Sequence, residues 1–393
     1  ATAVYAAVPR IDTAGMTPYV TAEASPRSAS LHYMPDGESF LRISPDRKAI
    51  LRYDVKSGKQ IDTLMNVKST RTTKINRVGG FTMSADGKKF LVYEDAEMIY
   101  RNSFKAKYYL YDAYRNTLRP LSEDHPAQQA PVFSPDARMV AFMADDNNIY
   151  LKKLDYWTEV AVTTDGKVNE VINGVPDWTY QEEFKLLNSM VWSPDNTTLC
   201  FIKFNEKSVR AFSFPLYQGS CDPMNQYALY PGSFTYKYPV AGEVNSKVSV
   251  HSYDVANRKT KRIALPDTSI EYIPRIDYGA TAEQLVVTTL NRDQNRMELY
   301  MVNPKSTVVK SILVEKWKAW INPDSYESTV YGPDGFVMMS DRTGYTHLYK
   351  YSYNGQLLKT MTNGNYDVTA YYGTAADGSY YYQSTGGDPL NRV

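Results

Sequence analysis

Several features that define common classes of protein are scarce or missing in this chain. Its 393 residues include only two cysteines, Cys200 and Cys221, and four histidines. No Cys-x-x-Cys or His-x-x-x-His pair occurs, so the sequence supports neither a disulfide framework nor a zinc site. The two cysteines could form one bridge, and two free thiols are the equal alternative. We expect no metal and no cofactor.

Charge and hydropathy argue against two further classes of protein. The 44 basic and 43 acidic residues leave a net charge of +1, which is not the footprint of a nucleic-acid-binding protein. The longest apolar runs, such as residues 1–8, fall far short of the ~18 residues of a spanning helix. No basic segment precedes that run, so we expect that a signal peptide was removed before this numbering begins.

The usual signatures of catalysis are also missing. None of the 21 glycines belongs to a Gly-x-Ser-x-Gly elbow, and no glycine-rich phosphate loop occurs. Residues 145–148 resemble a calcium loop only in composition, and a solvated turn is the better interpretation. His251 and His347 lie in predicted strands, where we expect them to form structural hydrogen bonds. The chain therefore offers no catalytic residue.

Tyrosine, with 34 residues, is abundant, and one pattern built on aromatic and β-branched residues recurs. An apolar residue is followed by Pro-Asp-Gly, or a near variant, and then by a strand-like run. Pro presets φ, Asp bonds its own backbone and Gly accepts positive φ, so each copy predicts a turn. The aspartates of these copies are Asp36, Asp86, Asp136, Asp195, Asp334 and Asp377. A weaker copy at residues 279–285 falls in the one long gap.

A second strand ending in a hairpin follows each turn, for example at residues 51–55, 110–112 and 299–301. Two hairpins in a period of about 50 residues make a four-stranded antiparallel blade. A sandwich of unrelated hairpins would not explain the period. We therefore predict an all-β fold, with an N-terminal segment at residues 1–25 and a β-propeller at residues 26–393. The propeller would have about seven blades, and the last would be incomplete at Val393. Because an open blade leaves unpaired edges, we expect further sequence to complete it.

The fourth repeat is interrupted between Phe204 and Val248 by a stretch rich in Tyr, Pro and Gly. An insertion of this length is either a functional arm or a disordered loop. Its aromatic content favours an ordered arm, residues 212–241, that contacts another protein.

Two adjacent carboxylates, Glu182 and Glu183, stand out at residues 177–184. In a strand they would point to opposite faces, but on a helical turn they lie about 100° apart and can share one small cation. Asp177 is a suitable N-cap, and Phe184 and Leu187 have helical spacing. We predict a short helix that carries a two-carboxylate clamp for an ammonium group. The alternative is that acidic residues simply stabilise the positive end of a helix.

A second candidate lies at residues 97–104, which interrupt the second blade. Arg101 could offer its fork of donors to a carbonyl or carboxylate group. The alternative is an ordinary surface ion pair.

Four motifs that follow one another along the chain resemble segments of the dipeptidyl peptidase IV family. Residues 177–184 look like its Asp-Trp-Val-Tyr-Glu-Glu-Glu motif, and residues 100–112 resemble its substrate-arginine segment. Residues 236–245 resemble the segment that follows its dimerisation arm, and residues 340–349 resemble a bacterial motif of the family. The similarity spans roughly residues 26–393.

The resemblance implies an eight-bladed propeller joined to an α/β-hydrolase domain with a Ser-Asp-His triad, which would lie mostly beyond residue 393. Such enzymes release dipeptides with proline or alanine second from peptide N-termini. Glu182 and Glu183 would hold the substrate amine and Arg101 its backbone carbonyl, with Trp178, Tyr180 and Gln181 as secondary site residues. The family commonly has a third glutamate where this chain has Gln181.

The expected function is thus substrate gating and amine recognition for a serine dipeptidyl aminopeptidase. Its partners would be peptides with a free N-terminus, its own hydrolase domain and a second copy bound through the arm. No nucleic acid and no membrane span are expected, and the location would be periplasmic or secreted. The alternatives are a non-catalytic propeller that binds proteins or peptides as a scaffold, and a family member that has lost its catalytic serine.

Overall fold

The computed structural model describes residues 31–219, 224–390 and 392. The predicted N-terminal segment at residues 1–25 and Cys221 lie outside the described residues. The described chain is almost entirely β-structure and divides into two compact units, one ending at Val78 and the other beginning at Gly79.

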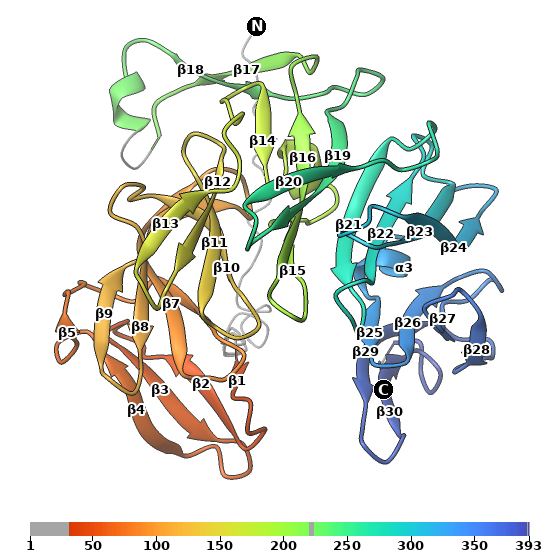
Figure 1. The fold of residues 1–393 in the computed structure, drawn as a ribbon, viewed down its shortest axis with the longest axis horizontal. Helices are drawn as coiled ribbons and strands as arrows, with labels where there is room; N and C mark the ends of the chain where they lie inside the picture. Colours follow the sequence, from red (N-terminus) through yellow and green to blue (C-terminus); the bar gives the residue numbers. More distant parts are fainter. Residues whose placement is uncertain (1–30, 220–223, 391, 393) are drawn as a thin grey trace, which may run out of the picture. The chain divides into compact units, whose positions relative to one another are not determined.

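The first unit contains one antiparallel sheet of four strands in the order β1-β2-β3-β4 (Figure 1, red to orange). These strands are β1 (His32–Tyr33), β2 (Ser39–Ile43), β3 (Ala49–Asp54) and β4 (Gln60–Asn66), and the short β5 (Arg71–Thr72) follows. Its buried side chains include Leu41, Ile50 and Met65. This is the first of the predicted four-stranded units.

The second unit contains the other sheets in chain order. The second sheet has β6 (Gly80–Met83), β7 (Lys89–Met98), β8 (Phe104–Asp112) and β9 (Thr117–Pro120). The third has β10 (Gln128–Phe133), β11 (Met139–Ala144), β12 (Ile149–Lys153) and β13 (Thr158–Ala161). The fourth has β14 (Val171–Asn173), β15 (Met190–Trp192), β16 (Thr198–Asn205), β19 (Lys247–Asp254) and β20 (Lys259–Ile263).

The fifth sheet has β21 (Tyr272–Tyr278), β22 (Leu285–Leu290), β23 (Arg296–Val302) and β24 (Val309–Lys316). The sixth has β25 (Val330–Gly332), β26 (Gly335–Ser340), β27 (His347–Tyr351) and β28 (Leu357–Thr360). The seventh has two strands, β29 (Val368–Thr374) and β30 (Tyr380–Ser384). The predicted all-β fold built of antiparallel sheets is confirmed, and the seventh sheet has two strands where the earlier ones have four or five.

Each predicted turn joins two neighbouring antiparallel strands, the first two of its sheet except at Asp195, which lies between β15 and β16. Hydrogen bonds within the turns show how they form. The hydroxyl group of Ser84 donates to Asp86 at 2.6 Å, and Ser193 donates to Asp195 at the same distance. The residue directly after the aspartate takes a positive φ, as at Gly87 (69°). The weaker copy also forms a turn, in which the N–H of Gly279 donates to the carbonyl oxygen of Gln284.

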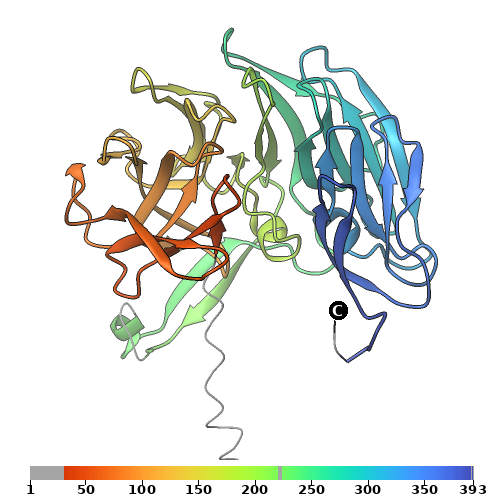
Figure 2. The ribbon, with the colours of Figure 1, turned by 90° about the horizontal axis from the view of Figure 1, so that it is seen from below.

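Successive sheets of the second unit share their buried side chains. One cluster joins the second and third sheets, another joins the third and fourth, a large one spans the fourth to sixth, and a last one joins the sixth and seventh. Representative members are Leu91, Phe142, Leu151, Phe201, Phe204, Val287, Met338, Met339 and Val368. Figures 1 and 2 show these sheets standing beside one another in chain order. This is the packing of propeller blades.

Three elements depart from the blade pattern. The helices are α2 (Trp178–Glu182) and α3 (Asp324–Glu327). The insertion in the fourth sheet forms an arm, a hairpin of β17 (Ala211–Leu216) and β18 (Gly232–Lys237) with the 3-10 helix η2 (Met224–Tyr227) between them. Among the described residues, no helix has the length and apolar character needed to cross a membrane.

Candidate functional site

Helix α2 begins where the sequence predicts, at the N-cap Asp177. One carboxylate oxygen of Asp177 accepts the N–H of Tyr180 at 3.2 Å, and the other accepts the hydroxyl group of Ser246 at 2.5 Å. Asp177 is buried, and this burial raises its pKa. The helix ends at Glu182, with Glu183 as its C-cap, and the chain turns at Lys185, whose φ is +50°. Leu187 therefore lies outside the helix and is 39 % exposed, so its predicted pairing with Phe184 on one helical face is wrong.

Tyr180 fixes the helix to the core of the unit. It is buried, and its hydroxyl oxygen accepts the N–H of Ile273 at 3.0 Å. Its ring lies 5.1 Å from that of Phe184, which in turn packs on Tyr272. Burial raises the pKa of Tyr180 well above its usual value. Tyr180 thus holds the helix in place and does not line the candidate cleft described below.

The long hairpin of β7 and β8 brings Arg101 to this helix. The tip closes through a hydrogen bond from the N–H of Ile99 to the carbonyl oxygen of Ser103. The backbone N–H of Arg101 donates to Glu182 Oε1 at 3.0 Å, and its Nε lies 3.5 Å from Oε2. The side chain of Glu182 is 9 % exposed, whereas that of Arg101 is 82 % exposed. Two of the predicted site residues therefore meet.

Glu183 is placed differently from Glu182. It is the C-cap residue of α2, it is exposed, and it is not among the residues that line the cleft beside Glu182 and Arg101. Gln181 points to the other side: it is buried and lines a separate, smaller cavity. Its amide nitrogen donates to the carbonyl oxygen of Pro176, and its Oε1 has no hydrogen-bond partner among the described residues.

The cleft has a volume of about 350 Å³. Its lining residues are Ile99, Tyr100, Arg101, Trp178, Glu182, Phe214, Phe234 and Tyr236. The last three come from the arm, and sequence reasoning did not assign them to the site. The ring of Tyr236 lies 5.5 Å from that of Tyr100 and 6.4 Å from that of Trp178, so the arm packs directly on the site.

The smaller cavity, of about 190 Å³, shares Tyr100 and Tyr236 with the cleft. Glu206 also lines it and is buried. Burial, together with the nearby charge of Asp177, raises the pKa of Glu206 to about 7, and Lys237 acts in the opposite direction. No local pattern marks Glu206 as buried, because a lone carboxylate after a strand usually faces solvent.

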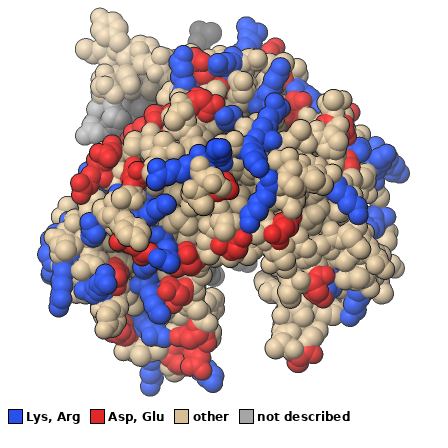
Figure 3. Space-filling view, in the orientation of Figure 1, with Lys and Arg blue, Asp and Glu red and all other residues tan. Residues whose placement is uncertain are grey.

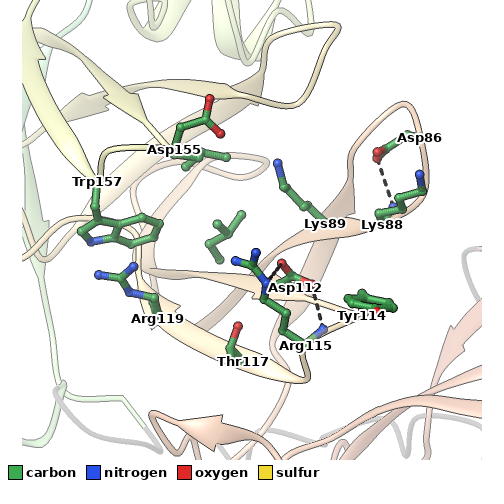
Figure 4. Close-up of a pocket in the computed structure, with 12 residues that line it drawn as sticks. Asp86, Lys88, Lys89, Asp112, Tyr114, Arg115, Thr117, Arg119, Asp155 and Trp157 are labelled. Atoms are coloured by element: carbon green, nitrogen blue, oxygen red, sulfur yellow. Dashed lines mark hydrogen bonds and ion pairs between the residues drawn. The ribbon is translucent and has the colours of Figure 1, made fainter.

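A cavity of about 690 Å³ in the second unit, larger than the cleft, involves none of the predicted site residues (Figure 4). The guanidinium group of Arg119 lies 3.8 Å from the ring centre of Trp157, and Lys89 donates to the carbonyl oxygen of Ala137. Asp112 and Arg115 form a further ion pair. These charged groups already have partners, so volume alone does not make this cavity a site.

Charges of both signs are intermingled on the face shown in Figure 3, in line with the near-zero net charge. Within the described residues, no three His, Cys, Asp or Glu side chains gather as a metal site would require. The groups that line the candidate site include a carboxylate, a guanidinium group and aromatic rings.

Residues 84–393 match the model of the family described as the dipeptidyl peptidase IV N-terminal region. A dipeptidyl-aminopeptidase B of Aspergillus niger is 28 % identical over 410 residues, which cover 95 % of this chain and 45 % of that protein. The crystal structure of Porphyromonas gingivalis dipeptidyl peptidase 4 has a TM-score of 0.86 at 42 % identity, covering 93 % of this chain and 51 % of that one. A solved Bacteroides ovatus chain has a TM-score of 0.65 at 19 % identity, covers 90 % of this chain and 49 % of that one, and supports the fold alone. This chain thus spans about half the length of these relatives.

Proposed function

Because this chain belongs to the dipeptidyl peptidase IV N-terminal region family, we propose that it is the substrate-recognising propeller of a serine dipeptidyl aminopeptidase. The full-length enzyme would release Xaa-Pro or Xaa-Ala dipeptides from peptides with a free N-terminus. The single observation that supports this role most strongly is the contact between Glu182 and Arg101 at the mouth of an aromatic cleft.

The chemistry of this contact suits a peptide N-terminus. An α-amine has a pKa of ~7.7–8.0 and is largely protonated at neutral pH. Its N–H groups would donate charge-assisted hydrogen bonds to Glu182, which is already oriented by the hairpin tip. Glu183 lies next to it on the helix and is exposed, so it is free to turn toward the same ammonium group. The exposed guanidinium group of Arg101 would bind the first backbone carbonyl.

A fixed amine also determines where the peptide is cut. An extended chain rises ~3.3–3.6 Å per residue, so the second peptide bond lies at one set distance from the glutamates. A nucleophile at that distance cuts only after the second residue. A hydrolase domain of the full-length enzyme would supply that nucleophile and perform the acyl transfer.

The proposal also covers the oligomeric state and the cellular location of the enzyme. The ordered arm, with Phe212, Tyr217, Leu229 and Tyr230 exposed, would contact a second copy in a homodimer. Cleavage of extracellular or envelope peptides would place the enzyme in the periplasm or outside the cell.

Kinetics of the full-length protein test this function. We expect it to hydrolyse a Gly-Pro chromogenic amide and to leave the N-acetylated form uncut, because acetylation removes the positive charge. A serine-directed phosphonate should abolish the activity. If neither substrate is hydrolysed and both peptides bind with equal affinity, the non-catalytic scaffold is the correct function.

A further inference from the structure

The arm presents one aromatic face to the site. In the hairpin of β17 and β18, Phe214 lies opposite Phe234, and Phe212 lies opposite Tyr236. Side chains two residues apart on paired strands share a face, so these four rings point the same way. The rings of Phe214 and Tyr236 stack at 5.6 Å, and those of Phe234 and Tyr236 lie 5.3 Å apart.

Tyr236 joins this face to the elements that carry the charged groups. Its ring contacts Tyr100 from the hairpin tip and Trp178 from helix α2. Trp178 also packs on Tyr238, with ring centres 4.3 Å apart. The arm therefore packs against helix α2. Its rings form one aromatic wall of the cleft beside Glu182.

Two rings of this wall keep much of their surface accessible. Phe214 is 37 % exposed and Phe234 is 46 % exposed, yet both line the same cleft as Arg101 and Glu182. Apolar surface beside a charged anchor is what a ligand with an ammonium group and an adjacent apolar group would cover.

The first residue of a peptide is such a ligand. Its side chain leaves the Cα atom, which lies ~1.46 Å from the amine nitrogen. An amine held at Glu182 therefore places the first side chain within the cleft or at its rim. Paired aromatic rings add to the stabilisation that buried area alone provides.

We propose that Phe214, Phe234 and Tyr236 form the wall that receives the side chain of the peptide's first residue. The enzyme would then prefer a bulky apolar or aromatic residue at that position over glycine, and the arm would determine specificity in addition to any contact with a second copy. This inference rests on the proposed function.

The test uses the full-length enzyme and two reporter amides, Phe-Pro and Gly-Pro, which differ only in the first side chain. We expect the wild type to favour Phe-Pro in kcat/KM. In Phe214→Ala/Phe234→Ala, the ratio of the two kcat/KM values should fall about tenfold, the size of effect typical of lost apolar pocket contacts, because only Phe-Pro has a first side chain that can contact these rings. The matched control is Leu229→Ala, an 87 % exposed arm residue outside the cleft, which should leave the ratio unchanged.

Two further measurements distinguish this role from misfolding of the arm and from a change in oligomeric state. Phe234→Leu keeps an apolar side chain and should retain most of the preference, which a misfolded arm would not. Sedimentation of the double variant reports its oligomeric state. An unchanged ratio of the two kcat/KM values, or an equal loss for both substrates, overturns the inference. If the ratio is unchanged and the oligomeric state changes, the aromatic face of the arm belongs to an intersubunit contact instead. If the wild type hydrolyses neither reporter, the proposed function itself fails and the inference fails with it.

Discussion

The backbone N–H of Arg101 donates a 3.0 Å hydrogen bond to the carboxylate group of Glu182, although 81 residues separate them in the chain. The bond uses the main chain of Arg101, while its side chain is 82 % exposed and its Nε lies 3.5 Å from the second carboxylate oxygen of Glu182. The main chain thus orients the carboxylate group, and most of the side chain stays accessible to a ligand. This division leads to the first prediction.

Arg101→Ala should reduce activity without reducing stability. The backbone bond to Glu182 survives the change, while the hydrogen bonds of a charged donor, worth about 1.5–3 kcal/mol, are lost. In the full-length enzyme, kcat/KM for a free-amine reporter should fall about 10- to 100-fold. The melting temperature should match that of Lys107→Ala, an exposed control on the same hairpin. A large fall in melting temperature would show that the side chain has a structural role instead.

Tyr180→Phe should destabilise the fold. The change removes the acceptor for the buried N–H of Ile273, and an unsatisfied buried donor costs about 1–3 kcal/mol. Urea titration should show this loss in the free energy of unfolding. Tyr114→Phe, at a residue that is 94 % exposed, provides the control and should have no effect. Equal stability of the two variants would contradict the anchoring role of Tyr180.

Glu206 should make the protein less stable as pH rises. Burial and the charge of Asp177 raise its pKa from 4.5 to about 7. Between pH 4.5 and pH 7, the folded state therefore keeps a proton on Glu206 that the unfolded state has released. The contribution of Glu206 to the free energy of unfolding is therefore greatest below pH 4.5 and is lost as pH rises through 7. The loss is up to about 3 kcal/mol, since one pKa unit corresponds to ~1.4 kcal/mol. The free energy of unfolding at pH 5 and pH 8 should differ less in Glu206→Gln than in the wild type. An identical pH dependence in both proteins would refute this assignment.

His251 should have the opposite effect. Burial, and then the charges of Lys203 and Arg262, lower its pKa from 6.5 to about 4, so the folded state keeps it neutral. Its contribution to stability is complete above pH 6.5 and is lost as pH falls toward 4, again by up to about 3 kcal/mol. His251→Gln should be less sensitive to acid between pH 6.5 and 4.5 than the wild type. Unfolding curves measured across that range check the difference, and parallel curves would contradict it.

The blades could be predicted because their signals are local. Ser84 bonds to Asp86 two residues later, and Asp177 caps the N–H of Tyr180 three residues later. Such contacts join residues two or three positions apart, so residue type and spacing are enough to predict them. The weak copy at residues 279–285 was recognisable for the same reason.

The candidate site could be predicted only in part because it depends on contacts between distant segments. The motifs pointed to Glu182 and Arg101, but the backbone bond between them depends on how far β7 and β8 extend. The position of Phe234 in the cleft depends on how the arm folds back onto α2, which no local pattern records. Glu206 was missed because its burial follows from the same packing.

The most direct test of amine recognition is the kcat/KM of full-length Glu182→Gln for a free-amine Xaa-Pro reporter. Glutamine keeps an oxygen that can accept the N–H of Arg101 but removes the negative charge that would bind the ammonium group. With Glu97→Gln as the control, at a 73 % exposed residue on the hairpin that carries Arg101, we predict a fall of about 100-fold in Glu182→Gln and none in Glu97→Gln. A value of kcat/KM within about twofold of the wild type in Glu182→Gln would contradict the account.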